Sequence, residues 1–284
     1  HETGRRLQVY YGSPIPDATV SDRDQRRGTA SFRPNDPHGG FIPDAAPMEY
    51  GCNGAGDFRI SALSVRNSSG DSTTDIRYKA HRIFAGKCRI PGLPATYVND
   101  DSEADTLEID MEDPVTGVVV TLCYAVFHQM GVITRSARIT NGSQSPVRLE
   151  RAMSLCVDLP SMEYDMITLY GRHVRERNYC RRALARGIQG VESKRGSSSH
   201  TQNPFTALVS RGANEDHGWC YGFNLVYSGN FTAMAECDFN ATTRFIMGIN
   251  PTDFSWKLEP GESFHTPEAV MVFSDKGMGE MSRI

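Results

Sequence analysis

The chain has 284 residues, of which 39% are hydrophobic and 23% are charged, a balance typical of a folded globular protein. Its net charge of -4 argues against a broadly basic surface for nucleic acids. No apolar run approaches the roughly 18 residues of a membrane span, so we expect neither a nucleic-acid nor a membrane partner.

The first unusual stretch, residues 12–47, is rich in proline, aspartate, arginine and glycine. It shows neither helical nor strand periodicity. Irregular segments of this length are uncommon inside compact domains and tend to be functional.

The next stretch, residues 49–59, reads EYGCNGAGDFR and holds Asp57 and Arg59. A phosphate-binding loop needs its glycines between a strand and a helix, but the residues that follow here alternate like a strand, and the Walker lysine is absent. Two interpretations remain. The stretch is a turn with positive-φ glycines, or a loop that presents Asp57 and Arg59 to a polar ligand; spacing alone favours the turn by about two to one.

The downstream sequence has a hydrophobic period of two, which predicts antiparallel strands. Residues 106–127 alternate, turn at DPVTG and resume with a β-branched run, as a hairpin does. Residues 131–160 repeat this scheme, with a turn at Asn141-Gly142. Residues 218–249 predict three strands, and residues 254–274 predict two strands around Pro260-Gly261.

Helix is scarce in the sequence. Residues 179–187, YCRRALARG, predict a helix of two turns, and residues 274–284 predict the N-capped start of another. Short strands at a spacing of about ten residues indicate an all-β sandwich or barrel, and one large antiparallel β-sandwich is the economical interpretation.

The cysteines and histidines do not predict a metal site. Seven cysteines contain no C-x-x-C pair, and eight histidines contain no H-x-H or H-E-x-x-H motif, so we expect neither metal nor cofactor. Cysteines inside apolar runs, such as Cys123, favour free buried thiols and a reducing compartment. We therefore expect a cytoplasmic protein, or a secreted one if the source is a fungus.

Two further stretches suggest chemistry, and each has a simpler explanation. Ser199 and His200 are adjacent, but neighbouring strand residues face opposite ways, so a polar loop is about ten times likelier than a hydrolase dyad. Trp219 and Tyr221 could form a sugar-stacking platform, although such aromatics fill the core about three times as often.

Eight stretches in series resemble the N-terminal domain of glycoside hydrolase family 36 α-galactosidases over essentially the whole chain. They read, in order, LQVYYG, EYGCNGAGDFR, DIRYKAHRIFAGK, GLPATYV, GVITRSARITN, RGSSSHTQNPF, YSGNF and LEPGESFHTPEAVMVFS. The sequence departs from the family pattern at Gly51 and Asn53, where a proline and an aromatic residue are usual, and at His173, where a tryptophan is expected.

This resemblance implies a large antiparallel β-supersandwich, similar to galactose mutarotase, with few short helices. Residues 1–284 would form this single domain, and residues 275–284 would start a linker helix toward a (β/α)8 catalytic domain that the chain lacks. Both catalytic aspartates of the family belong to that barrel, so we expect no catalytic residue here.

The resemblance also implies a function. The full enzyme would hydrolyse terminal α-D-galactosyl residues of melibiose- or raffinose-type oligosaccharides with retention. This domain, inactive by itself, would support the barrel and the rim of the substrate pocket, and Asp44, Asp57 and Arg59 would lie near substrate. The barrel, the α-galactosides and further copies of the chain, as a tetramer, are the partners implied.

Two other functions stay open at this point. A stand-alone carbohydrate-binding module would hold galactosides with Trp219, Tyr221 and Arg59. A mutarotase-like enzyme is suggested by the fold relation alone, and fold does not imply function.

Overall fold

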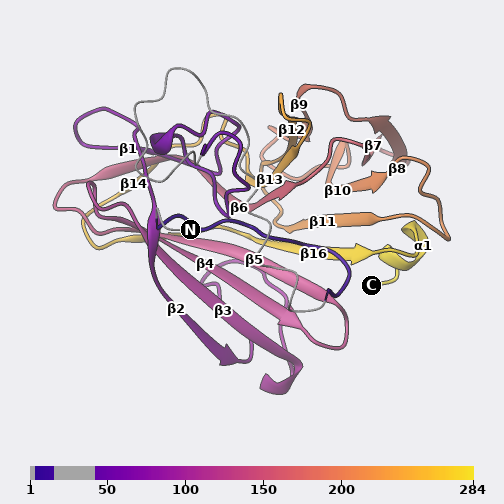
Figure 1. Ribbon diagram of the computed structural model, residues 1–284, viewed down its shortest axis with the longest axis horizontal. Helices are drawn as coiled ribbons and strands as arrows, with labels where there is room; N and C mark the ends of the chain where they lie inside the picture. The colour runs from indigo at the N-terminus through magenta and orange to yellow at the C-terminus, as the bar shows by residue number, and fades with distance from the viewer. Residues whose placement is uncertain (1–3, 16–41) are drawn as a thin grey trace.

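Two packed β-sheets, one of ten strands and one of six, are formed by the residues that the computed structural model describes, 4–15 and 42–284 (Figure 1). The pairings between the named strands are antiparallel. The all-β supersandwich expected from the sequence is confirmed. Most of the irregular stretch 12–47 lies outside the described residues.

The larger sheet carries a continuous path of nine strands, and β15 (Ser263–His265) pairs with β5 beside that path. In spatial order the path runs β2 (Arg77–Ala85), β3 (Ala104–Glu112), β4 (Val118–Phe127), β5 (Val132–Asn141), β16 (Glu268–Ser274), β11 (Cys220–Val226), β10 (Gln202–Ser210), β7 (Tyr164–Arg172) and β8 (Arg175–Ala183).

The smaller sheet is centred on the long strand β6. Its spatial order is β1 (Leu63–Arg66), β6 (Val147–Leu159), β13 (Thr243–Ile249), β12 (Phe231–Cys237) and β9 (Gly187–Glu192), with β14 (Trp256–Leu258) also pairing with β6. Helical turns are short: η2 (Asn53–Ala55), η3 (Asp101–Glu103) and α1 (Met278–Met281).

The hairpin predicted from residues 106–127 is confirmed as β3 and β4. Its turn is closed by Asp113, whose backbone carbonyl accepts from the Gly117 amide at 2.8 Å and whose carboxylate accepts from the Val115 amide at 2.9 Å. Gly117 has φ +75°, a conformation that glycine adopts without steric cost.

The second predicted hairpin, residues 131–160, is wrong. The strands exist as β5 and β6, but β5 pairs with β4 and β16 in the larger sheet while β6 is the centre of the smaller one. The Asn141 side chain donates to Ser145 O and Leu258 O. It thus stabilises the connection from the larger sheet to the smaller one instead of closing a tight turn. Alternation predicts a strand but not its partner.

The other local predictions have mixed outcomes. Residues 218–249 form the three expected strands, whereas residues 254–274 form three strands instead of two. The helix expected at 179–187 is wrong, because most of that stretch is β8, which pairs with β7. Pairing with a neighbouring strand has overridden helix propensity there. The C-terminal helix exists as α1, but its N-cap, Gly277, makes no side-chain hydrogen bond.

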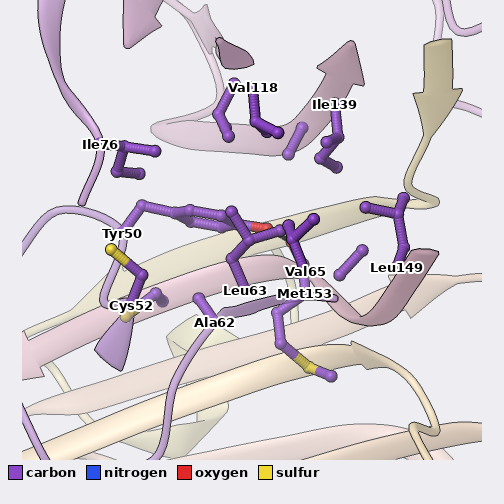
Figure 2. Packing of buried hydrophobic residues seen from close by; sticks show 14 of the residues in the cluster. Tyr50, Cys52, Ala62, Leu63, Val65, Ile76, Val118, Ile139, Leu149 and Met153 are labelled. Carbon is purple, nitrogen blue, oxygen red and sulfur yellow. Dashed lines mark hydrogen bonds between the residues drawn. The ribbon is translucent and has the colours of Figure 1, made fainter. Parts of the chain in front are cut away.

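The core lies between the two sheets. Phe223 of β11 stacks on Phe245 of β13 across the interior, with ring centroids 4.4 Å apart. A second part of the core collects Leu63, Val65, Ile139 and Leu149 around the Tyr50 side chain, as Figure 2 shows. The stretch 49–59 therefore enters the protein interior at Tyr50.

Candidate functional site

The candidate site is the loop of residues 49–59, and its first residue is held by a buried cation. The Glu49 carboxylate lies 3.1 Å from Arg135 Nη2 and accepts a hydrogen bond from the Tyr124 hydroxyl. Arg135 also donates from Nη1 to Cys156 O at 2.7 Å, and its guanidinium lies 4.7 Å from the Tyr124 ring centroid. Burial keeps the pKa of Tyr124 well above its usual value, so this hydroxyl stays a donor.

The next residues anchor the loop in the core. Tyr50, 2% exposed, donates its hydroxyl to Met153 O at 2.6 Å. At Gly54 the backbone passes so close to Thr74 that an added Cβ would lie 2.1 Å from Thr74 O. Gly56 ends η2 in the left-handed region, with φ +86°. Gly54 thus allows the backbone to pass close to Thr74, and Gly56 allows the turn that ends η2.

The far end of the loop is fixed by five buried charges. Arg244 donates from Nε and Nη2 to the two oxygens of Asp158, at 2.7 and 2.8 Å, and its Nη1 lies 2.8 Å from Asp57 Oδ2. Arg59 donates from Nε to Asp57 Oδ1 at 2.9 Å, and its Nη1 lies 3.4 Å from Asp158 and 4.0 Å from Asp238. These five side chains, called the buried ion cluster below, are at most 5% exposed.

Three carboxylates and two guanidinium groups leave the buried ion cluster with a formal charge of -1. Hydrogen bonds offset the excess: Asp158 accepts from the Met48 amide, and Asp238 accepts from the Thr242 hydroxyl and amide. Burial alone would lower the pKa of Arg244, but the Asp158 and Asp57 carboxylates outweigh it and raise that pKa well above its usual value. Arg244 therefore stays charged, and the hydrogen bonds that pair the polar atoms of the cluster make it rigid.

Arg59 also ties in the segment before the loop. Its Nη2 donates to Pro43 O at 3.0 Å and to Ala46 O at 2.6 Å. In parallel, the Phe58 amide donates to Asp44 Oδ1 at 2.9 Å. Residues 43–46 and 57–59 are thus bound together as one unit.

The structure brings Asp44, Asp57 and Arg59 together and buries the last two. All three guanidinium nitrogens of Arg59 already face carboxylates or carbonyls. Their contact with substrate stays a prediction, and the geometry favours a positioning role. The loop instead exposes Asn53 and Phe58, the latter 72% exposed between two buried neighbours.

Sequence reasoning missed Arg244, Asp158 and Asp238, which complete the buried ion cluster. Arg244 and Asp158 lie inside apolar strands, in TRFIMGI and LCVDLP, and a charged residue within such a run was the available signal. Fully buried arginine and aspartate are rare unless paired. The pairing itself depends on β6 and β13 lying side by side.

The sugar platform considered for Trp219 and Tyr221 does not form. Tyr221 is 4% exposed and packs in the core against Phe273, while Trp219 is 57% exposed. Ser199 accepts a hydrogen bond from the Thr201 amide, as a polar turn residue does. Among residues 4–15 and 42–284, no group of three or more histidine, cysteine or acidic side chains is arranged to hold a metal ion. No helix in the same residues has the length and hydropathy of a membrane span.

Comparison with known proteins gives one consistent result. The family model described as the glycosyl hydrolase family 36 N-terminal domain matches residues 4–259. The curated α-galactosidase AgaA of Geobacillus stearothermophilus is 48% identical over 283 residues, which are 99% of this chain and 39% of AgaA. α-Galactosidase C of Emericella nidulans is 40% identical over 242 residues, 85% of this chain and 32% of that protein.

Solved structures agree with the sequence relatives. The crystal structure of AgaA superimposes with a TM-score of 0.95, covering 99% of this chain and 39% of AgaA. An AgaA variant in complex with raffinose gives a TM-score of 0.96 at 48% identity, covering 100% of this chain and 40% of that one. The chain thus spans about 39% of the length of AgaA. On its fold and on these matches, the chain belongs to the N-terminal domain family of glycosyl hydrolase family 36.

Proposed function

We propose that this domain is the non-catalytic N-terminal part of an α-galactosidase that removes terminal α-galactosyl residues from raffinose-type oligosaccharides. The observation that carries the proposal is the match of the whole chain, at 48% identity, to the corresponding part of an α-galactosidase whose variant binds raffinose. Catalysis would belong to a (β/α)8 domain, and residues 275–284, which include α1 (Met278–Met281), would lead toward it.

The chemistry of the described residues supports a non-catalytic role. A retaining glycosidase needs two carboxylates about 5–5.5 Å apart on either side of an accessible glycosidic bond. Asp57, Asp158 and Asp238 do cluster, but each is at most 5% exposed and is paired with an arginine. A sugar could not reach them without breaking the buried ion cluster.

The direct test compares the whole protein with the 284-residue chain in an assay with 4-nitrophenyl α-D-galactopyranoside. Turnover by the whole protein and none by the purified chain is expected. Turnover by the chain alone would refute the division of labour, and an inactive whole protein would contradict the activity. Calorimetric titration of the chain with melibiose and raffinose tests the binding-module alternative. Binding of either sugar with a millimolar Kd would support that alternative.

The loop 49–59 would form part of the pocket rim in the whole enzyme. The buried ion cluster fixes its backbone, and Phe58 offers an exposed aromatic face suited to the apolar face of a sugar. In the whole protein, Phe58→Ala should lower kcat/KM for raffinose about 3- to 10-fold and leave the unfolding free energy of the chain within about 0.5 kcal/mol. Phe239→Ala, at another exposed phenylalanine, is the matched control and should change neither.

Asp44, Asp57 and Arg59 act in this proposal by holding the rim. Arg59→Ala separates the two roles considered for that residue. A positioning role predicts that the unfolding free energy and kcat/KM fall together. A direct bond to sugar predicts, besides that loss of stability, a KM about tenfold higher with kcat unchanged.

We further propose, from the family resemblance alone, that the whole enzyme is a homotetramer. Multi-angle light scattering on the whole protein tests this, and a monomer at micromolar concentration would contradict it.

A further inference from the structure

A β-bulge on the outer face of the smaller sheet places two consecutive side chains in one pocket. In the pairing of β1 with β6, Ser64 lies opposite Arg151 and Val65 lies opposite Leu149, so Glu150 is the extra residue. Consecutive strand residues normally face opposite ways, but a bulge re-aims one of them. Glu150 and Arg151 consequently line the same pocket.

This pocket has a volume of about 470 Å³ and a mostly polar wall. Besides the bulge it is lined by Asn53 of the loop, Ser61, Ser64 and Thr252. The hydroxyl and amide groups of these residues can donate hydrogen bonds.

The charge of Arg151 in the wall is not neutralised within the described part of the chain. Arg151 donates from Nη1 to Ser61 O at 3.3 Å and to Ser61 Oγ at 3.2 Å, and no carboxylate among the described residues forms an ion pair with it. Its Nε is buried without a hydrogen-bond partner. Partial burial lowers the pKa of Arg151, which marks a desolvated cation without a compensating anion.

Glu150 does not supply that anion, because its carboxylate is already paired with Arg66. Its two oxygens accept from Arg66 Nε and Nη2 at 2.6 and 3.0 Å. Arg66 lies outside the pocket lining and neutralises Glu150, so the positive charge of Arg151 in the wall stays uncompensated.

We propose that this pocket binds a small oxyanion, a carboxylate or a phosphate group, with Arg151 as its charged partner. The Arg151 guanidinium can donate to either group from Nη2, whereas a neutral ligand would leave the cation uncompensated. The Ser61 hydroxyl accepts from Arg151, so its own proton is free to donate to the ligand, and Asn53, Ser64 and Thr252 offer further donors from the pocket wall.

The experiment uses the 284-residue chain with inorganic phosphate, acetate or chloride at constant ionic strength. Titration calorimetry should give a millimolar Kd for phosphate or acetate, and the unfolding temperature should rise by a few degrees at tenfold excess over Kd. Binding of both probes supports a general oxyanion site. Binding of phosphate alone or of acetate alone supports the site and identifies its ligand group.

Variants locate the binding. Arg151→Gln should weaken it at least tenfold, and Arg148→Gln, which removes an exposed arginine of the same strand, should leave it unchanged. Asn53→Ala, at an exposed position where folding is not at risk, should weaken it about twofold to fivefold. The proposal is overturned if neither probe binds, if chloride acts equally, or if Arg148→Gln weakens binding as much as Arg151→Gln.

Discussion

Replacing Arg244 with methionine (Arg244→Met) should destabilise the fold, because it removes a cation from the buried ion cluster. The arginine side chain is 0% exposed and is bonded to Asp158 at 2.7 and 2.8 Å and to Asp57 at 2.8 Å. Its removal leaves Arg59 alone to serve three carboxylates, and the formal charge goes from -1 to -2. Removing one partner of a buried ion pair costs about 3–5 kcal/mol, because the remaining charge is desolvated and unpaired.

Methionine fills much of the space that arginine occupied, so the expected loss is mainly electrostatic. Urea unfolding of the 284-residue chain should show an unfolding free energy lower by about 3–5 kcal/mol, and Tm should fall by roughly 10 °C. The matched control is Arg211→Met, since Arg211 pairs with Glu163 at 3.0 Å but both side chains are about half exposed. It should lose less than about 1 kcal/mol.

A double variant tests the stated cause. If an unpaired carboxylate is what destabilises Arg244→Met, adding Asp158→Asn should give a loss smaller than the sum of the two single losses, by about 1–3 kcal/mol. Strict additivity, or a loss below about 1 kcal/mol for Arg244→Met, would refute the reasoning.

Three further predictions use local features of the structure. Burial lowers the pKa of His265, so the folded state prefers the neutral ring, and stability present above pH 7 should decline as the pH falls toward 5. His265→Gln should flatten that decline in thermal unfolding scans, and an unchanged slope would contradict it. A hydrogen bond with Cys123 lowers the pKa of the Cys88 thiol. Iodoacetamide at pH 7.5 should therefore alkylate Cys88 before Cys123, which peptide mass mapping would show. The reverse order would be evidence against this prediction. Gly54→Ala would force a Cβ to within 2.1 Å of Thr74 O and should lower the unfolding free energy by about 1–3 kcal/mol, and a neutral result in urea unfolding would disprove the close approach.

The class of fold and many of the strands could be predicted from the sequence. Side chains on a strand alternate between two faces, so a half-buried strand leaves its pattern in the sequence, as β6 does where Val147 and Leu149 are buried and Arg148 is exposed. The DPVTG turn is equally local, because Asp113 bonds the amides of its own turn. Where a stretch such as 179–187 lacked a clear pattern, helix propensity misled the prediction, and the strand pairing of β8 decided its structure.

Which strands pair, and with that the environment of the loop 49–59, depends on contacts between residues far apart in the sequence. The two strands of residues 131–160 look like a hairpin but belong to different sheets. The sequence shows Asp57 and Arg59 as polar residues beside glycines, which suggests exposure. The fold brings β6 and β13 beneath them, so that Asp158 and Arg244 turn the same residues into a buried ion cluster. Ion pairs between distant residues leave no periodic trace, because any arginine can pair with any carboxylate that the sheets bring within reach.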